Sequence, residues 1–298
     1  MSPNLRGAAF MTLSMASGTV SDTLVKALSA GMNMGQIMLL RGIAATVLIF
    51  LLAHHRGALR PLAAAFHPMV VLRSIGEVGA TVTFLIALTH VPVADASAIY
   101  QSMPLAVTVG AALFLGEPVG WRRWSAILVG FAGVMIIIRP GFEGFSGWSL
   151  MILGSVGFGT LRDLATRRIP AGTPSLFISA VTAPAVAVTG AVLVVPLGGW
   201  QPVDLGMAAW LVGAAMLLLV NYQFITMAMR EGDIAFVSPF RYTGLPFAML
   251  LGFVVFADAP DLPMVGGAAI VVGSGLYMLH RERRLMRRVA VVTRPAPR

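Results

Sequence analysis

Two copies of one spaced motif decide the fold. They read Ser14-x-x-x-Gly18-x-x-x-Asp22-x-x-x-Lys26 and, further along the chain, Ser155-x-x-x-Gly159-x-x-x-Asp163-x-x-x-Arg167. A spacing of four places the marked residues of each copy along one face of a helix. Each copy lies in an apolar segment, so the sequence predicts a duplicated membrane unit.

Composition indicates a membrane protein. Of 298 residues 57% are hydrophobic and 11% are charged, and the mean hydropathy is +0.85, whereas soluble domains carry roughly 25% charged residues. The apolar residues form blocks long enough to cross a hydrocarbon core of ~30 Å as helices. We predict an all-α integral membrane protein with ten transmembrane helices at roughly 5–28, 35–53, 68–89, 92–115, 121–139, 146–168, 173–196, 205–228, 232–256 and 263–280.

Several classes of function are disfavoured. The chain has no cysteine and its five histidines are scattered, so we expect no metal site and no cofactor. Its net charge of +9 comes from arginines between apolar blocks, which does not suit a nucleic-acid surface. Catalytic and nucleotide-binding motifs are missing. We expect a non-enzyme; the disfavoured alternative of another class is an intramembrane enzyme, which would need a nucleophile and base or metal ligands clustered at one depth.

Basic residues predict the orientation. With the N-terminus inside, two basic residues, Lys26 and Arg139, fall outside, and fifteen arginines fall inside, seven of them in the tail after residue 280. Because loop arginines and lysines are retained in the cytoplasm, both termini are predicted to be cytoplasmic. Four arginines remain within the membrane: Arg41, Arg73, Arg162 and Arg241.

The repeat extends beyond the opening motif. At the same offset Ala87, Ala94 and Ser97 match Ala228, Ala235 and Ser238, and Glu117 matches Asp258. One unit is then five spans, at residues 1–140 and 141–280, with a basic tail at 281–298. An odd number of spans inverts the second unit, and inverted repeats favour alternating access around a site near the midplane.

The fourth span carries a resemblance to a known family. Its residues are Ala94-Asp95-Ala96-Ser97-Ala98-Ile99-Tyr100, Pro104-Leu105 and Leu115-Gly116-Glu117-Pro118; the second copy keeps Ala235-Phe236-Val237-Ser238, Pro246 and Phe256-Ala257-Asp258, with Asp for Glu and with Arg241 at the position of Tyr100. The chain thereby resembles the drug/metabolite transporter superfamily, in its EamA-type, ten-span branch. The resemblance implies export or exchange of a small molecule across a bacterial inner membrane, by a monomer.

Charged residues inside the bilayer are the strongest site candidates, because each is costly unless it faces a polar interior. Glu77 and Arg241 are predicted near the midplane, and Arg73 can pair with Glu77 one turn away. A permanent salt bridge and a functional role, as partner of a substrate ammonium or as proton relay, are equally favoured for Glu77. For Arg241 we favour binding of a carboxylate over an interhelix pair with Glu77.

The motif residues have other expected roles. Small residues Ser14, Gly18, Ser155 and Gly159 are expected to pack helices closely. Local ion pairs of Asp22 with Lys26, and of Asp163 with Arg162 or Arg167, are expected near opposite mouths, where structural roles are slightly favoured over gating. Arg41 is grouped with these ion-pair residues.

Aromatic and amide side chains complete the candidate site. Tyr100, Gln101, Asn221, Tyr222, Phe224 and Tyr242 as a set suit a small zwitterion with an apolar side chain. We therefore expect an exporter of small metabolites, with amino acids, especially aromatic or other apolar ones, as the leading class. Drugs and organic anions such as phosphorylated sugars are the alternative substrates, and a passive channel is a third alternative.

Overall fold

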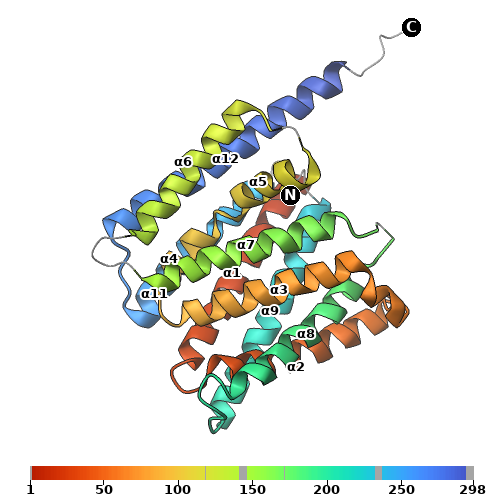
Figure 1. Cartoon of the computed structure of the whole chain (residues 1–298), viewed down its shortest axis with the longest axis vertical. Coiled ribbons are helices and arrows are strands. Elements are labelled where there is room, and N and C mark those ends of the chain that lie inside the picture. The colour runs from red at the N-terminus through yellow and green to blue at the C-terminus, as the bar shows by residue number, and fades with distance from the viewer. Residues whose placement is uncertain (1, 118, 141–145, 171, 232–236, 293–298) are drawn as a thin grey trace.

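The computed structural model describes residues 2–117, 119–140, 146–170, 172–231 and 237–292 (Figure 1). All regular elements in these ranges are helices: α1 (Pro3–Leu28), α2 (Met34–His55), η1 (Leu62–Phe66), α3 (Pro68–Leu88), α4 (Val93–Tyr100), α5 (Met103–Leu115), α6 (Trp121–Ile138), α7 (Gly147–Arg167), α8 (Ser175–Val194), α9 (Leu205–Glu231), η2 (Ser238–Thr243), α11 (Gly244–Phe256) and α12 (Leu262–Val292). Pro118 of the first family motif, and Ala235 and Phe236 of the second, lie outside the described residues.

Eight helical segments of the described chain are long and apolar enough to cross a membrane. They are α2, α3, α4 with α5, α6, α8, α9, η2 with α11, and α12. Helices α1 and α7, with 26 and 21 residues, are long enough but less apolar. They carry the two copies of the opening motif, whose serine, glycine and charged residues lower their hydropathy.

The fourth predicted span is broken, although the sequence predicted one continuous helix over 92–115. Helix α4 ends at Tyr100, Gln101 and Ser102 form a turn, and α5 begins at Met103. Pro104 lies in the first turn of α5, where its missing N–H costs no helical hydrogen bond. A second break in the α-helical run is the 3-10 helix η2, after which α11 begins directly at Gly244. It contains Arg241 and Tyr242, which are the repeat equivalents of Tyr100 and Gln101.

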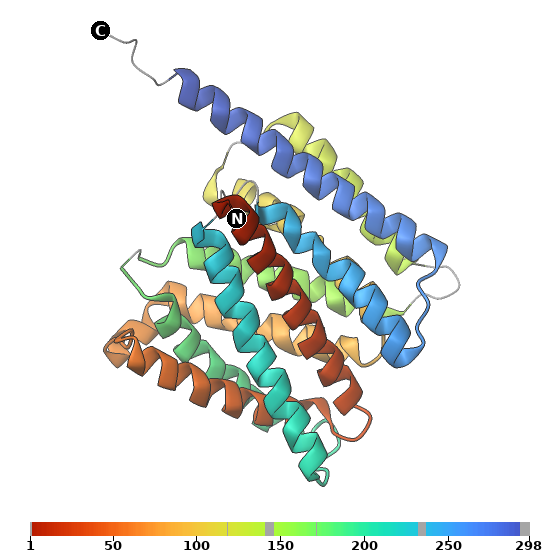
Figure 2. The same ribbon diagram turned by 180° about the vertical axis from the view of Figure 1, so that it is seen from behind.

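Helices far apart in the sequence pack in pairs. Helix α1 packs with α9, α2 with α8, α3 with α7, and α6 with α12. Figure 1 shows the α6/α12 pair at one edge of the molecule and the α2/α8 pair at the opposite edge, and Figure 2 shows α1, α9 and α11 from behind. The largest cluster of buried apolar side chains joins several of these helices and includes Ile37, Leu88, Ile99, Ile152 and Val271.

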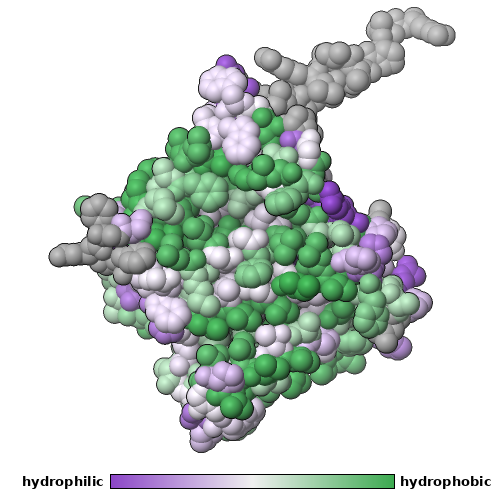
Figure 3. Space-filling model, in the orientation of Figure 1, coloured by the Kyte–Doolittle hydropathy of each residue, from purple (hydrophilic) through white to green (hydrophobic). Residues whose placement is uncertain are grey.

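Glycines permit the closest helix contacts. A Cβ atom added at Gly133 of α6 would lie 2.8 Å from the carbonyl oxygen of Gly267 in α12, and one added at Gly190 of α8 would lie 2.5 Å from the amide nitrogen of Leu39 in α2. Apolar residues dominate the middle of the face in Figure 3, while hydrophilic residues gather toward the helix ends. This is the surface expected of a bundle that contacts lipid around its waist.

Candidate functional site

The two helix breaks meet inside the bundle. Tyr100 ends α4 and Gln101 lies in the turn after it, whereas Arg241 and Tyr242 lie in η2 before α11. The Gln101 side-chain amide donates to the backbone carbonyl of Arg241 at 3.3 Å. Interrupted helices expose backbone and polar side chains at membrane depth, which is tolerated where they line a protein interior or a cavity.

Arg241 has no carboxylate partner among the described residues, where Glu77 pairs with Arg73 and Arg162 instead. The Nε atom of Arg241 is buried without a hydrogen-bond acceptor, and the neighbouring Tyr242 hydroxyl is also buried without a partner. The Tyr242 hydroxyl faces Gly275 of α12, where an added Cβ would overlap it. The alternative considered for Arg241, an interhelix pair with Glu77, is therefore not formed in this structure.

Glu77 belongs to an ionic network between α3 and α7. Its Oε2 lies 3.7 Å from Nη2 of Arg73, one turn away, and 3.5 Å from Nη1 of Arg162 on α7. Arg162 also donates from Nε to Oδ1 of Asp163 at 2.8 Å, and Arg73 donates to the hydroxyl of Thr182 on α8 at 2.7 Å. Sequence reasoning missed Thr182, because its role depends on the packing of α3 against α8.

Lys26 does not pair with Asp22, which corrects the sequence expectation. Its Nζ lies 3.6 Å from Oδ2 of Asp258, donates to the carbonyl of Val91 at 2.6 Å, and lies 4.9 Å from the ring centroid of Phe256. Lys26 is in the last turn of α1, so its side chain can reach the neighbouring loops.

Asp22 and Arg167 also depart from the expected local pairs. Within the described chain Asp22 has no ion pair within 4.0 Å, and Arg41 is the charged group that acts on it electrostatically. Arg167 pairs with Glu117 at 2.9 Å, whereas Asp163 pairs with Arg162. The sequence placed Glu117 and Asp258 in matching positions of the repeat and in the family motif, but it did not predict their ion pairs. Their match in the repeat was the signal that could have done so.

The small residues of the opening motif lie in helix contacts. Ser14 is fully buried and donates to the backbone carbonyl of Asn221 on α9 at 2.9 Å, while the Asn221 amide donates back to the carbonyl of Ser14 at 2.6 Å. A Cβ at Gly18 would lie 2.6 Å from Asn221, and a Cβ at Gly159 would overlap the side chain of Met103. Ser155 is also fully buried and donates to Ile152 of its own helix.

The aromatic candidates lie in different surroundings. Tyr100 packs against Phe84 with ring centroids 5.2 Å apart, and Phe224 stacks on Phe10 at 5.6 Å. Tyr222 is 41% exposed, and the charges of Glu77, Arg162, Arg73 and Arg41 act on it. Tyr100 and Tyr222 are therefore within electrostatic reach of the ionic network, while Asn221 is engaged in the contact between α1 and α9.

Another ion pair joins the helix ends outside the spans. Arg139, which follows α6, donates to Asp261, which precedes α12. The hydrogen bond from Arg139 lowers the pKa of the Asp261 carboxyl, and the hydrogen bond to Asp261 raises the pKa of the Arg139 guanidinium. Asp261 also accepts from the backbone N–H of Met264 and caps α12.

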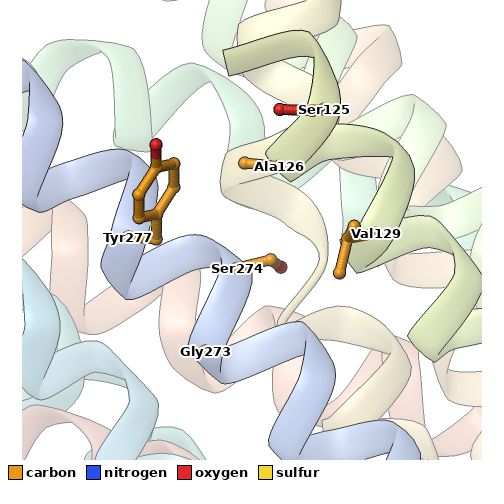
Figure 4. A pocket seen from close by; sticks show the side chains of 6 residues that line it. All are labelled: Ser125, Ala126, Val129, Gly273, Ser274 and Tyr277. Atoms are coloured by element: carbon orange, nitrogen blue, oxygen red, sulfur yellow. The ribbon is translucent and has the colours of Figure 1, made fainter. Parts of the chain in front are cut away.

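A shallow groove between α6 and α12 lies away from the network. Its volume is about 320 Å³, and Ser125, Ala126, Val129, Gly273, Ser274 and Tyr277 line it (Figure 4). The groove contains no charged side chain. In the part of the chain described, no group of three or more His, Asp or Glu residues is placed to hold a metal ion.

Comparisons with known proteins agree on a class. The EamA-like transporter family matches residues 5–139. A riboflavin transporter of Rhizobium johnstonii is 33% identical over 74% of this chain and 72% of its own length. An S-adenosylmethionine uptake transporter of Rickettsia felis is 24% identical over 95% of this chain and 96% of its own, and the pseudopaline exporter CntI of Pseudomonas aeruginosa is 28% identical over 85% and 89%.

The fold also matches a solved structure. A crystal structure superimposes with a TM-score of 0.64 over 94% of this chain and 98% of its own, at 18% sequence identity. Combined with eight segments apolar enough to cross a membrane and with relatives that are transporters, these matches identify a multi-pass bacterial membrane protein that transports a small molecule. The chain belongs to the EamA-like transporter family.

Proposed function

We propose that α1 and α7 also cross the membrane, giving ten spans in two inverted five-helix repeats at residues 1–140 and 141–280, followed by a basic cytoplasmic tail. The helix pairs support this arrangement, because exchanging the proposed repeats turns the α1/α9 pair into the α7/α3 pair and leaves α2/α8 and α6/α12 as they are. The two breaks at equivalent positions support it as well. Alternating access follows from such symmetry.

We further propose that the transported molecule carries a carboxylate, with amino acids as the leading class and export as the direction. One observation carries this proposal: the guanidinium of Arg241 in η2, whose Nε is buried, has no carboxylate partner among the described residues. A guanidinium binds a carboxylate through two parallel hydrogen bonds. Glu77 and Asp163 are the acidic groups nearby for an ammonium, and Tyr100 and Tyr222 offer rings for an apolar side chain.

Amino-acid export also agrees with the sequence resemblance, which extends to the bacterial amino-acid exporter YddG. The matched relatives favour a second candidate, riboflavin transport, because a riboflavin transporter is 33% identical to this chain. Riboflavin has aromatic rings but no carboxylate. Multidrug or phosphosugar transport is the other alternative. We expect a highly charged phosphate to need several cations in the site, rather than Arg241 alone.

Flux in proteoliposomes tests the substrate class. The probes are phenylalanine, phenylalaninamide, which lacks the carboxylate, and riboflavin. We expect saturable counterflow of phenylalanine and at least tenfold less of its amide, the loss typical of one charge-assisted contact, about 1.5–3 kcal/mol. The measurement is repeated at equal pH and with a pH gradient, which determines whether transport is proton-coupled.

The matched variants are Arg241→Gln and Arg139→Gln. Removing the Arg241 guanidinium should abolish the preference for phenylalanine over its amide, whereas removing that of Arg139, outside the spans, should leave the preference intact. If riboflavin moves and no amino acid does, the leading substrate class is wrong. Unchanged phenylalanine affinity in Arg241→Gln would return Arg241 to a structural role, and flux that never saturates would favour a channel.

A further inference from the structure

Two ion pairs at opposite ends of the bundle are equivalent under the offset that relates Ser14 to Ser155. Lys26, in the last turn of α1, pairs with Asp258, which follows α11. Arg167, in the last turn of α7, pairs with Glu117, which follows α5. Each pair joins the first helix of one proposed repeat to the fourth helix of the other.

The two acidic residues are positioned by the same backbone turn. Gly116 and Ala257 both adopt left-handed conformations, with φ of 68° and 57°, after the ends of α5 and α11. The amide of Glu117 then donates to Ala111 at 3.2 Å, and that of Asp258 donates to Gly252 at 3.1 Å, where Ala111 and Gly252 are again equivalent positions of the repeat. Equivalent helix caps therefore place the two carboxylates beside two equivalent cations. The two ion pairs resemble each other in backbone conformation as well as in the type of side chain.

The surroundings of the two pairs differ. Side-chain exposures are 13% for Lys26 and 33% for Asp258, against 51% for Arg167 and 49% for Glu117. Lys26 also contacts the Val91 carbonyl and the face of Phe256. An exposed pair is weakened by solvent and salt, whereas a shielded cation over an aromatic ring is weakened less.

We propose that Lys26–Asp258 and Arg167–Glu117 are reciprocal gating pairs, which close the outer and the inner mouth respectively in the predicted orientation. Breaking one pair favours opening at its own end. Because the inner pair is the more exposed, the substrate-free protein opens inward more readily than outward. This proposal rests on alternating access between the two repeats, and it does not depend on the identity of the substrate.

The pair between Arg139 and Asp261 is a matched control. It lies at the same end of the bundle as Lys26, since Asp95 of α4 is electrostatically coupled to both pairs. However, it joins the ends of α6 and α12, and the equivalent positions 280 and 120 are His280 and Gly120, which form no such pair. Its loss should leave both mouths unchanged.

Spin-label distances test the proposal in the absence of substrate. The chain has no native cysteine, so labels attach only where cysteines are introduced. Ala30 and Val254 report on the outer mouth, and Thr166 and Leu113 on the inner mouth; all four side chains are exposed. Double electron–electron resonance then gives the ratio of long to short separations at each mouth.

Opposite responses are expected from the two single substitutions. Asp258→Asn should raise the long-to-short ratio at the outer mouth on the order of two- to fivefold, the range for weak ion pairs, and Glu117→Gln should do so at the inner mouth. Asp261→Asn should change neither ratio. In labelled protein that keeps both ion pairs, the long separation should be more populated at the inner mouth than at the outer one.

Charge reversal separates gating from folding. Lys26→Asp combined with Asp258→Lys should restore the original outer ratio, and raising KCl from about 0.1 to about 1 M should open the inner mouth before the outer one. The proposal is overturned if Asp258→Asn and Glu117→Gln act on the same mouth or on neither, or if reversal and salt have no effect. If substrate flux persists while neither distance ever changes, alternating access itself is contradicted.

Discussion

Tyr100 and Arg241 occupy equivalent positions in the two helix breaks, yet only Arg241 carries a charge. The first position, at the end of α4, thus carries a phenol, and the second, in the 3-10 helix η2, carries a guanidinium. Asp22, Glu77 and Asp163 each have another arginine nearby: Arg41 acts on Asp22, and Arg162 pairs with Glu77 and Asp163. Single residues, rather than the fold, therefore give the site its polarity and its proposed preference for an anionic group.

Replacing Glu77 tests the network between α3 and α7. Glu77→Gln leaves the guanidiniums of Arg73 and Arg162 without their shared carboxylate, so we expect a loss of about 3–5 kcal/mol in the free energy of unfolding, as for a broken buried pair. Thermal unfolding in detergent measures the change. Asp204→Asn, at an exposed helix cap, is the control.

The same Glu77→Gln variant also tests whether Glu77 relays protons. Full flux driven by a pH gradient in this variant would exclude a proton relay at Glu77.

Gly275 tests the contact between α12 and η2. Gly275→Ala should destabilise the protein by about 1–3 kcal/mol, because the new methyl group would overlap the Tyr242 hydroxyl and force a shift. Gly273→Ala, where an added Cβ meets no atom within 4 Å, should be neutral or slightly stabilising. Equal unfolding temperatures for the two variants would show that Tyr242 has room to move.

At the level of elements, the left-handed helix caps at Gly116 and Ala257 give predictions of opposite sign. A non-glycine residue in this conformation costs roughly 1 kcal/mol, so Ala257→Gly should raise the unfolding temperature and Gly116→Ala should lower it. An added Cβ at Gly116 meets no neighbour within 4 Å, which leaves backbone conformation as the cause. The two variants, measured by thermal unfolding in one detergent, would disagree with this account if their changes had the same sign.

The Arg139–Asp261 pair predicts a pH dependence. Because the hydrogen bond from Arg139 lowers the pKa of Asp261 in the folded protein, its stabilisation is complete above the pKa of the unfolded carboxyl, about 3.9. The stabilisation is lost as pH falls through the lower folded pKa. The difference in unfolding temperature between the original protein and Asp261→Asn should therefore shrink as the pH falls from about 5 to about 2. A difference that stays constant over this range would mean that Asp261 stabilises the protein as the cap of α12 and not through its ion pair.

At the scale of the whole molecule, the sequence predicted a helical membrane protein. This was possible because the length of each apolar segment can be read from that segment alone, without knowledge of how the helices pack. The break after Tyr100 was missed, since periodicity continues through it and only Pro104 marks it. The partners of charged residues were harder to predict than the helices. A spacing of one helical turn suggested an ion pair of Lys26 with Asp22, whereas the packing of the bundle places Lys26 beside Asp258. The repeat matched Asp258 with Glu117, but which helix lies beside each acid depends on the assembled bundle.

The pairing of α1, α2, α3 and α6 with α9, α8, α7 and α12 has a consequence for biosynthesis. When the ribosome has completed residues 1–140, each of these four helices still lacks its principal neighbour, and its small-residue and charged faces have only lipid or one another to contact. The nascent protein must remain in the membrane as an intermediate until the later helices are inserted, exposed meanwhile to quality-control proteases. Assembly of the bundle thus requires both halves of the chain.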